Sequence, residues 1–134
     1  METVENYIGI SYAWKVYRIV IMPPSFPFGG MENPLLTFAS PSIITRNGQK
    51  SGVGVAIHEI AHSWTGNMVT CGNWSNMWLN EGFTVFLERH ADLVLFGPDY
   101  YKTDAINGND SMWTDMLKFG LNSTFSSLFP LTQG

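Results

Sequence analysis

His58-Glu59-Ile60-Ala61-His62 is the stretch from which the rest of this 134-residue chain can be interpreted. Two histidines four positions apart on a helix project from one face, one turn above the other. Both imidazoles can then bind the same metal ion, and Glu59 can reach a water molecule on that ion as a general base. The stretch therefore predicts a helix that carries two ligands of a zinc site.

A hydrolytic zinc site needs three protein ligands and an open fourth position for water. The third ligand should come from another element, and Glu81 is the candidate, nineteen positions after His62 and early in a second predicted helix. Two histidines and one carboxylate, with Glu59 left free beside them, form a hydrolytic set. The alternative is a helix with two surface histidines that bind nothing, and the spacing of Glu81 argues against it.

Two more residues of the second helix are placed by helical geometry. Glu88 lies seven positions after Glu81, on nearly the same face, and a metal-bound histidine usually donates its second nitrogen to such a carboxylate. An ordinary exposed carboxylate is an equally good interpretation of Glu88. His90, nine positions after Glu81, faces about 180° away and is predicted to be structural or exposed to solvent.

The other elements follow from apolar patterns and from the positions of Gly and Pro. Residues 2–13 are ambiguous and fit the end of a helix. Strands are predicted at 16–22, largely buried, at 35–40 and at 42–45, followed by a turn at 47–48. Helices are predicted at 51–67, capped by Ser51 and ended by Gly66, at 76–96 with a cap from Ser75 or Asn76, and at 99–119 with a weak point at 107–109, before a tail without regular structure.

Composition narrows the class of protein further. The length allows one domain at most, and 45% hydrophobic residues are enough for a core. The aromatic content of 14% is high for so short a chain and suggests surfaces that pack against something else. The net charge of −4 without a run of like charges argues against nucleic acid or an anionic membrane as partner.

Location is the second inference that composition allows. No apolar run approaches the roughly 18 residues that suggest a membrane span. Cys71 is the only cysteine, so no internal disulfide is possible, and the N-terminus lacks the pattern of a signal peptide. We therefore expect a cytoplasmic protein that does not bind a membrane.

Three stretches resemble the gluzincin zinc metalloaminopeptidases. Gly29-Gly30-Met31-Glu32-Asn33 matches the GxMEN motif of that family. The two histidines of the opening stretch and Glu81 match its zinc motif, including the gap of eighteen residues. The longer runs at 23–34, 58–67 and 78–85 look like the branch that holds leukotriene-A(4) hydrolase and aminopeptidase B, and the resemblance covers about residues 4 to 130.

The resemblance implies an α+β fold, a thermolysin-like catalytic core with short N-terminal strands followed by metal-binding helices. It implies one zinc per chain on His58, His62 and Glu81, and removal of N-terminal amino acids from peptides with Glu59 as the base. Glu32 would hold the free α-amino group, beside substrate-binding Gly29, Gly30, Met31 and Asn33. Hydrolysis of a leukotriene-type lipid epoxide would use the same ion and the same Glu59.

The chain also departs from the family pattern. The family has a tyrosine well downstream of the third zinc ligand that helps to stabilise the oxyanion, and Tyr100 and Tyr101 lie too close after Glu81 to match it. We expect residues 1–134 to form part of the catalytic domain, without the N-terminal β domain and the C-terminal helical domain. The alternative function is therefore a zinc-binding protein that acts by interaction and not by catalysis. Substrate side-chain preference and oligomeric state stay open.

Overall fold

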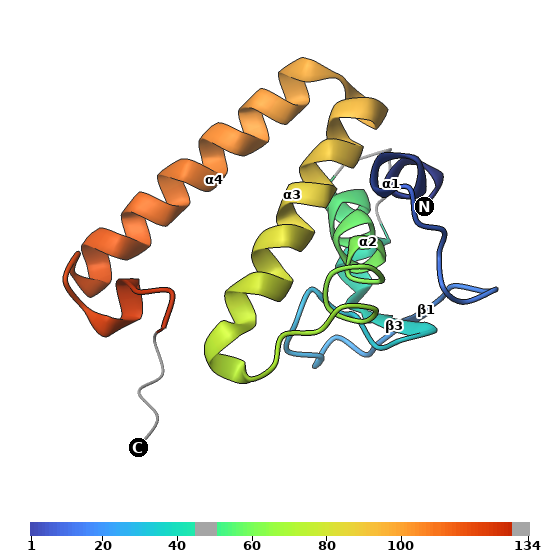
Figure 1. Cartoon of the computed structure of the whole chain (residues 1–134), viewed down its shortest axis with the longest axis horizontal. Helices are drawn as coiled ribbons and strands as arrows, with labels where there is room; N and C mark the ends of the chain where they lie inside the picture. Colours follow the sequence, from blue (N-terminus) through green and yellow to red (C-terminus); the bar gives the residue numbers. More distant parts are fainter. Residues whose placement is uncertain (45–50, 130–134) are drawn as a thin grey trace.

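The computed structural model describes residues 1–44 and 51–129, which form a small sheet packed beside a group of helices (Figure 1). This arrangement confirms the predicted α+β class. The α-helices and strands follow in the order α1 Glu2–Ile8, β1 Arg18–Ile21, β2 Gly30–Met31, β3 Leu36–Ala39, α2 Ser51–Ala61, α3 Met77–Phe96 and α4 Pro98–Phe119. Three short 3₁₀ helices are η1 Pro41–Ile43, η2 Trp74–Asn76 and η3 Thr124–Ser126.

The sheet has the strand order β1-β3-β2, with β1 parallel and β2 antiparallel to the central strand β3. The prediction that the first strand is largely buried is wrong, because all four residues of β1 are exposed. The physical reason is that β1 is an edge strand, while α2 packs against β2 and β3. β2 holds Gly30 and Met31, and its pairing with β3 brings the 29–33 stretch next to α2.

Two local predictions before α2 have different outcomes. The predicted strand at 42–45 is wrong for its described part, because η1 begins at Pro41, and Ser40 accepts a hydrogen bond from the Ser42 backbone N–H at 3.2 Å. Proline at the first position and a serine cap favour a helical turn over a strand. Position 45 and the predicted turn at 47–48 lie outside the described residues, as does the side chain of Ser51.

The first predicted helix ends earlier than expected, at Ala61 and not near 67. The Ser63 and Trp64 N–H groups then reach back only three residues, after which the Asn67 N–H donates to the His62 carbonyl at 3.0 Å and two further N–H groups also reach back five residues. Gly66, with φ +137°, lies inside these turns and does not end the helix. The consequence is a compact turn directly after His62.

The next two helices match their predicted extents closely. α3 begins one residue after Asn76, although the Asn76 side chain makes no capping hydrogen bond to the helix. The predicted weak point at 107–109 is wrong, because α4 is continuous from Pro98 to Phe119. A Cβ at Gly108 would lie 2.1 Å from Arg89 Nη2, so the glycine there lets the arginine of α3 cross close to α4. Packing between the two helices thus outweighs the low helix propensity of this segment.

The hydrophobic core lies where α1, α2 and α3 meet. Its buried members are Val4, Ile57, Ala61, Trp64, Leu87 and Ala91. The indole of Trp64 donates to the Ile10 carbonyl at 2.9 Å, which joins the segment after α1 to the turn after α2. This core fixes α2 and α3 against each other, and the candidate site lies between them.

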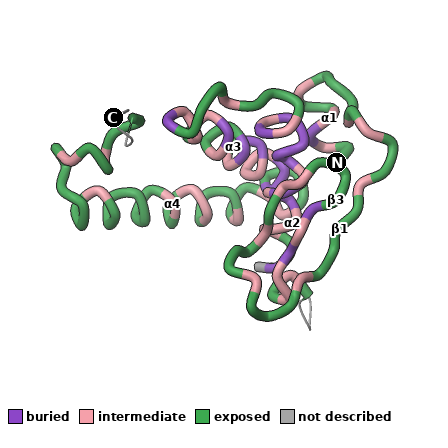
Figure 2. Tube along the Cα trace, turned by 90° about the horizontal axis from the view of Figure 1, so that it is seen from below, coloured by how far each residue is buried: buried purple, intermediate pink, exposed green. Residues whose placement is uncertain are grey.

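By contrast, α4 extends away from the core, with exposed and intermediate residues along its length and none buried (Figure 2). Several aromatic side chains are strongly exposed, among them Trp74 at 74% and Phe125 at 69%. Within the described ranges, none of the helices has both the length and the apolar character needed to cross a bilayer.

Candidate metal centre

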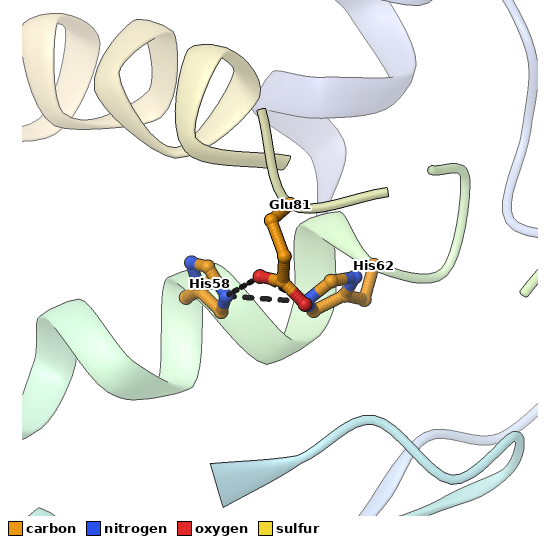
Figure 3. Close-up of side chains that lie close together, drawn as sticks. All are labelled: His58, His62 and Glu81. Atoms are coloured by element: carbon orange, nitrogen blue, oxygen red, sulfur yellow. Dashed lines mark hydrogen bonds and ion pairs between the residues drawn. The ribbon is translucent and has the colours of Figure 1, made fainter. Parts of the chain in front are cut away.

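The side chains of His58, His62 and Glu81 meet between α2 and the N-terminal part of α3 (Figure 3). The two histidine Nε2 atoms are 3.1 Å apart. Glu81 Oε2 lies 3.3 Å from Nε2 of His58 and 3.5 Å from Nε2 of His62. Ligand atoms bound tetrahedrally at 2.0–2.1 Å would be about 3.3 Å apart, so the spacing fits three ligands of one zinc ion.

The second nitrogen of each imidazole faces a hydrogen-bond acceptor. His58 Nδ1 is 2.8 Å from Glu88 Oε2, and His62 Nδ1 is 2.9 Å from the Thr65 carbonyl oxygen. A carboxylate and a carbonyl can only accept, so both Nδ1 atoms carry a proton. When each ring is neutral, its Nε2 presents a lone pair, and three lone-pair donors then face one point. A divalent cation satisfies this arrangement.

The pKa values of the three groups also reflect a demand for positive charge at this point. Burial would lower the pKa of His58, but hydrogen bonds to the Glu81 and Glu88 carboxylates outweigh it and raise the pKa to about 10. Burial would also lower the pKa of His62, but its hydrogen bonds to Glu81 and the Thr65 carbonyl, together with the charge of Glu32, outweigh burial and raise the pKa. Hydrogen bonds from the two imidazoles lower the pKa of Glu81 to about 2. The surroundings thus favour a cation held among the three side chains.

Glu59 lies next to this cluster and points to the other side of it, toward β2. Only 5% of the residue is exposed, and burial raises the pKa of its carboxyl group to about 7. Among the described residues, Glu59 Oε2 has no hydrogen-bond partner. A Cβ at Gly30 would lie 2.1 Å from Glu59 Oε1, so the bare glycine backbone is what leaves room for this carboxylate.

Glu32 reaches the same place from the segment that follows β2. Its Oε1 is 3.9 Å from His62 Nδ1, and it forms a second close group with Glu59 and His62. Asn67, in the turn after α2, donates its side-chain N–H to the Glu32 carbonyl at 2.7 Å. The turn that begins at His62 therefore also holds the backbone that carries Glu32.

A cavity of about 730 Å³ opens over these side chains. Gly30, Met31 and Glu32 line it together with both histidines, Glu59 and Glu81, whereas Gly29 and Asn33 do not. Gly29 instead faces Val55 of α2, with 3.8 Å to a Cβ placed on it. The wall also contains apolar residues that sequence analysis did not single out: Phe28, Trp74 and Met77.

Outside the centre, His90 is stacked on Tyr7 of α1 with 3.7 Å between ring centroids, so it faces away from the site as predicted. One buried residue of α3 escaped the sequence analysis. Thr84 Oγ1 lies 3.0 Å from His62 Nδ1. The available signal was its position three residues after Glu81, on the same face of the helix.

This fold and this set of side chains are those of a family of peptidases. Residues 1–125 match the Peptidase family M1 domain, and the chain belongs to this family. The sequence is 44% identical over 134 residues to leucine aminopeptidase 2 of Emericella nidulans. The aligned region covers all of this chain and 21% of the relative. It is 45% identical over 119 residues to leukotriene A-4 hydrolase of Xenopus laevis. This aligned region covers 89% of this chain and 19% of the relative.

Solved structures agree with this placement. The structure of native yeast LTA4 hydrolase superposes with a TM-score of 0.86 at 38% identity, over 96% of this chain and 20% of that chain. The resemblance to the branch with leukotriene-A(4) hydrolase is thereby confirmed. The chain spans about a fifth of the length of the relatives it matches.

Proposed function

We propose that this chain carries the zinc-binding and proton-transferring part of a metalloaminopeptidase, which removes the N-terminal amino acid from peptides. The observation that carries the proposal is the convergence of Nε2 of His58, Nε2 of His62 and Oε2 of Glu81 at 3.1–3.5 Å, with both Nδ1 atoms paired to acceptors. The aminopeptidase named among the relatives supports the same reaction class.

The residues of this site divide the work of peptide hydrolysis among them. A zinc ion held by the three ligands would polarise the scissile carbonyl and lower the pKa of a water molecule. Glu59 takes a proton from that water at its unpartnered Oε2 and then passes the proton to the leaving amine. Burial raises the pKa of Glu59 to about 7, which suits a group that accepts a proton and returns it near neutral pH.

Glu32 supplies the preference for the end of a peptide. Its carboxylate is in the same cavity as Glu59 and is 13% exposed, so it is desolvated but still open to a ligand. A carboxylate in that position forms a charge-assisted hydrogen bond with an α-ammonium group. Gly30 and Met31 of β2 line the cavity beside it and leave room for the first residue of the peptide.

A second candidate reaction is hydrolysis of a lipid epoxide. Two observations favour it: the relative from Xenopus laevis is named leukotriene A-4 hydrolase, and the cavity wall includes apolar Phe28, Trp74 and Met77. Both reactions would use the same ligands and the same Glu59. A lipid epoxide and an aminoacyl-naphthylamide offered to the same preparation distinguish them.

The test begins with metal analysis of the purified chain. We expect one zinc per chain, lost in His58→Ala and kept in His90→Ala, the matched control on the far side of α3. Glu59→Gln should keep the zinc and lose hydrolysis of an aminoacyl-naphthylamide. A parent protein without zinc would overturn the metal assignment, and full activity of Glu59→Gln would overturn the assignment of the base. Bound zinc with no hydrolysis by the parent would favour the alternative of a non-catalytic zinc protein.

A further inference from the structure

A buried threonine of α3 is joined to the ring of His62 and to the turn that follows it. Thr84 is fully buried, with 0% exposed surface. Its hydroxyl group donates to the Thr65 carbonyl at 2.8 Å and lies 3.0 Å from His62 Nδ1. The Thr65 hydroxyl is 2.6 Å from the same Thr84 oxygen. Three polar groups therefore meet at one hydroxyl in a place without solvent.

The directions of these hydrogen bonds can be assigned from donor and acceptor capacity. The Thr65 carbonyl accepts only, and the single hydroxyl proton of Thr84 is used on it. Thr84 Oγ1 is then left as an acceptor for the His62 Nδ1–H and for the Thr65 hydroxyl. The opposite assignment would place a bare Nδ1 against the Thr65 carbonyl at 2.9 Å, lone pair against lone pair.

The turn after α2 brings the Thr65 carbonyl to this position. Backbone hydrogen bonds from Asn67 to His62 and from Val69 to Trp64, at 3.0 and 3.1 Å, fold the segment back over the histidine. Gly66 approaches the ring so closely that a Cβ there would lie 2.8 Å from His62 Nδ1. The local backbone leaves His62 little freedom, and Thr84 ties that backbone to α3.

We propose that Thr84 is a positioning residue of the metal centre, which holds His62 in the tautomer that presents its Nε2 lone pair toward Glu81. The inference rests on the proposed function, because it takes Nε2 of His62 to be a metal ligand. Thr84 acts in two ways: it accepts from Nδ1–H directly, and it fixes the carbonyl that accepts from the same proton. Outer partners of metal-bound histidines typically contribute 10–100-fold to metal affinity.

The experiment compares the zinc affinities of the full chain and four variants by competition with a chromophoric chelator. The variants are Thr84→Val, Thr84→Ser, Thr84→Ala and Thr114→Val. Thr84→Val removes the hydroxyl group at nearly constant volume, and Thr84→Ser retains it. Thr114→Val is the matched control, because the Thr114 hydroxyl donates to a backbone carbonyl at 2.8 Å on exposed α4. Since the Thr65 carbonyl remains as a partner of His62, we expect the lower end of the range, about a tenfold weaker zinc affinity in Thr84→Val. Thr84→Ser and Thr114→Val should bind zinc as the parent does.

If Thr84→Val does not fold, the pair Thr84→Ser and Thr84→Ala decides, because the two differ by the hydroxyl oxygen alone. Zinc affinity that is equal in that pair, or equal in Thr84→Val and Thr114→Val, would overturn the inference.

A second readout is the tautomer of His62 itself, measured by two-bond ¹H–¹⁵N NMR of the imidazoles in the metal-free chain at alkaline pH, where the ring is neutral. We expect the proton on Nδ1 in the parent and in Thr84→Ser, and a mixture of tautomers in the variant without the hydroxyl group. A purely structural threonine would not change this ratio. A parent that binds no zinc contradicts the proposed function, whereas a parent that binds zinc with a bare His62 Nδ1 contradicts the role of Thr84 alone.

Discussion

Replacing Glu88 tests whether a residue that is not itself one of the three ligands orients the His58 imidazole in the metal centre. Glu88 Oε2 accepts from His58 Nδ1 at 2.8 Å, and the Glu88 side chain is 21% exposed, so the bond is only partly screened by water. Glu88→Gln keeps an acceptor but removes the charge, whereas Glu88→Ala removes both. We expect zinc affinity to fall about 10-fold in the glutamine variant and about 100-fold in the alanine variant.

These losses of zinc affinity can be converted into expected changes in thermal stability. With zinc in large excess over its dissociation constant, each tenfold loss of affinity removes about 1.4 kcal/mol of stabilisation by bound metal. For a chain of this size, that difference lowers the midpoint of zinc-loaded unfolding by about 5 °C. The quantity to compare is the zinc-loaded midpoint minus the metal-free midpoint, because each substitution also changes the protein without metal.

Asp104→Asn is the control for this comparison. Asp104 accepts from Arg89 at the same 2.8 Å, again between a carboxylate and a charged side chain, but it contacts no member of the metal cluster. The zinc affinity of the Asp104→Asn variant, and the shift of its unfolding midpoint on zinc binding, should equal those of the parent. If Glu88→Gln behaved like Asp104→Asn in both measurements, Glu88 would be an ordinary surface carboxylate and the reasoning about His58 would be refuted.

Two further substitutions test the catalytic pocket and the core. Gly30→Ala places a Cβ 2.1 Å from Glu59 Oε1 and forces the carboxylate to move by about 1 Å, so we expect retained zinc with about 100-fold slower aminoacyl-naphthylamide hydrolysis. A loss no greater than in Gly82→Ala, whose Cβ meets nothing within 4 Å, would contradict this. Leu87→Ala, at a core position with 5% exposure, should lower the free energy of unfolding in urea by about 3 kcal/mol. Leu117→Ala, at 68% exposure, should change it by less than about 0.5 kcal/mol, and equal effects of the two would argue against the core as described.

Where sequence analysis succeeded, the determining signals were local. The extents of α3 and α4 follow from Gly97 and Pro98, which stop one helix and start the next. Where it failed, distant contacts decided the structure. The burial of β1 depends on which strands α2 covers, and the continuity of α4 depends on Arg89 crossing at Gly108. Neither relation has a signature within the segment itself.

For the metal centre, too, the local pattern was predictable and the long-range contacts were not. Spacing alone brought His58, His62 and Glu81 together, and the structure places their ligand atoms within 4.8 Å of one another. The end of α2 at Ala61 was not predictable, because the turn after it is held partly by Trp64, whose indole bonds to the carbonyl of Ile10. That turn supplies the acceptor for His62, so the surroundings of one ligand depend on contacts more than fifty residues apart.

One face of α3 explains why the two histidines are oriented together. Glu81, Thr84 and Glu88 follow one another at spacings of three and four, so all three project toward α2. The first faces both Nε2 atoms, the second lies against Nδ1 of His62, and the third accepts from Nδ1 of His58. Because a single rigid helix carries all three contacts, a shift of α3 would disturb both imidazoles at once. The burial of Leu87 and Ala91 on the same helix therefore bears on metal affinity as well as on stability.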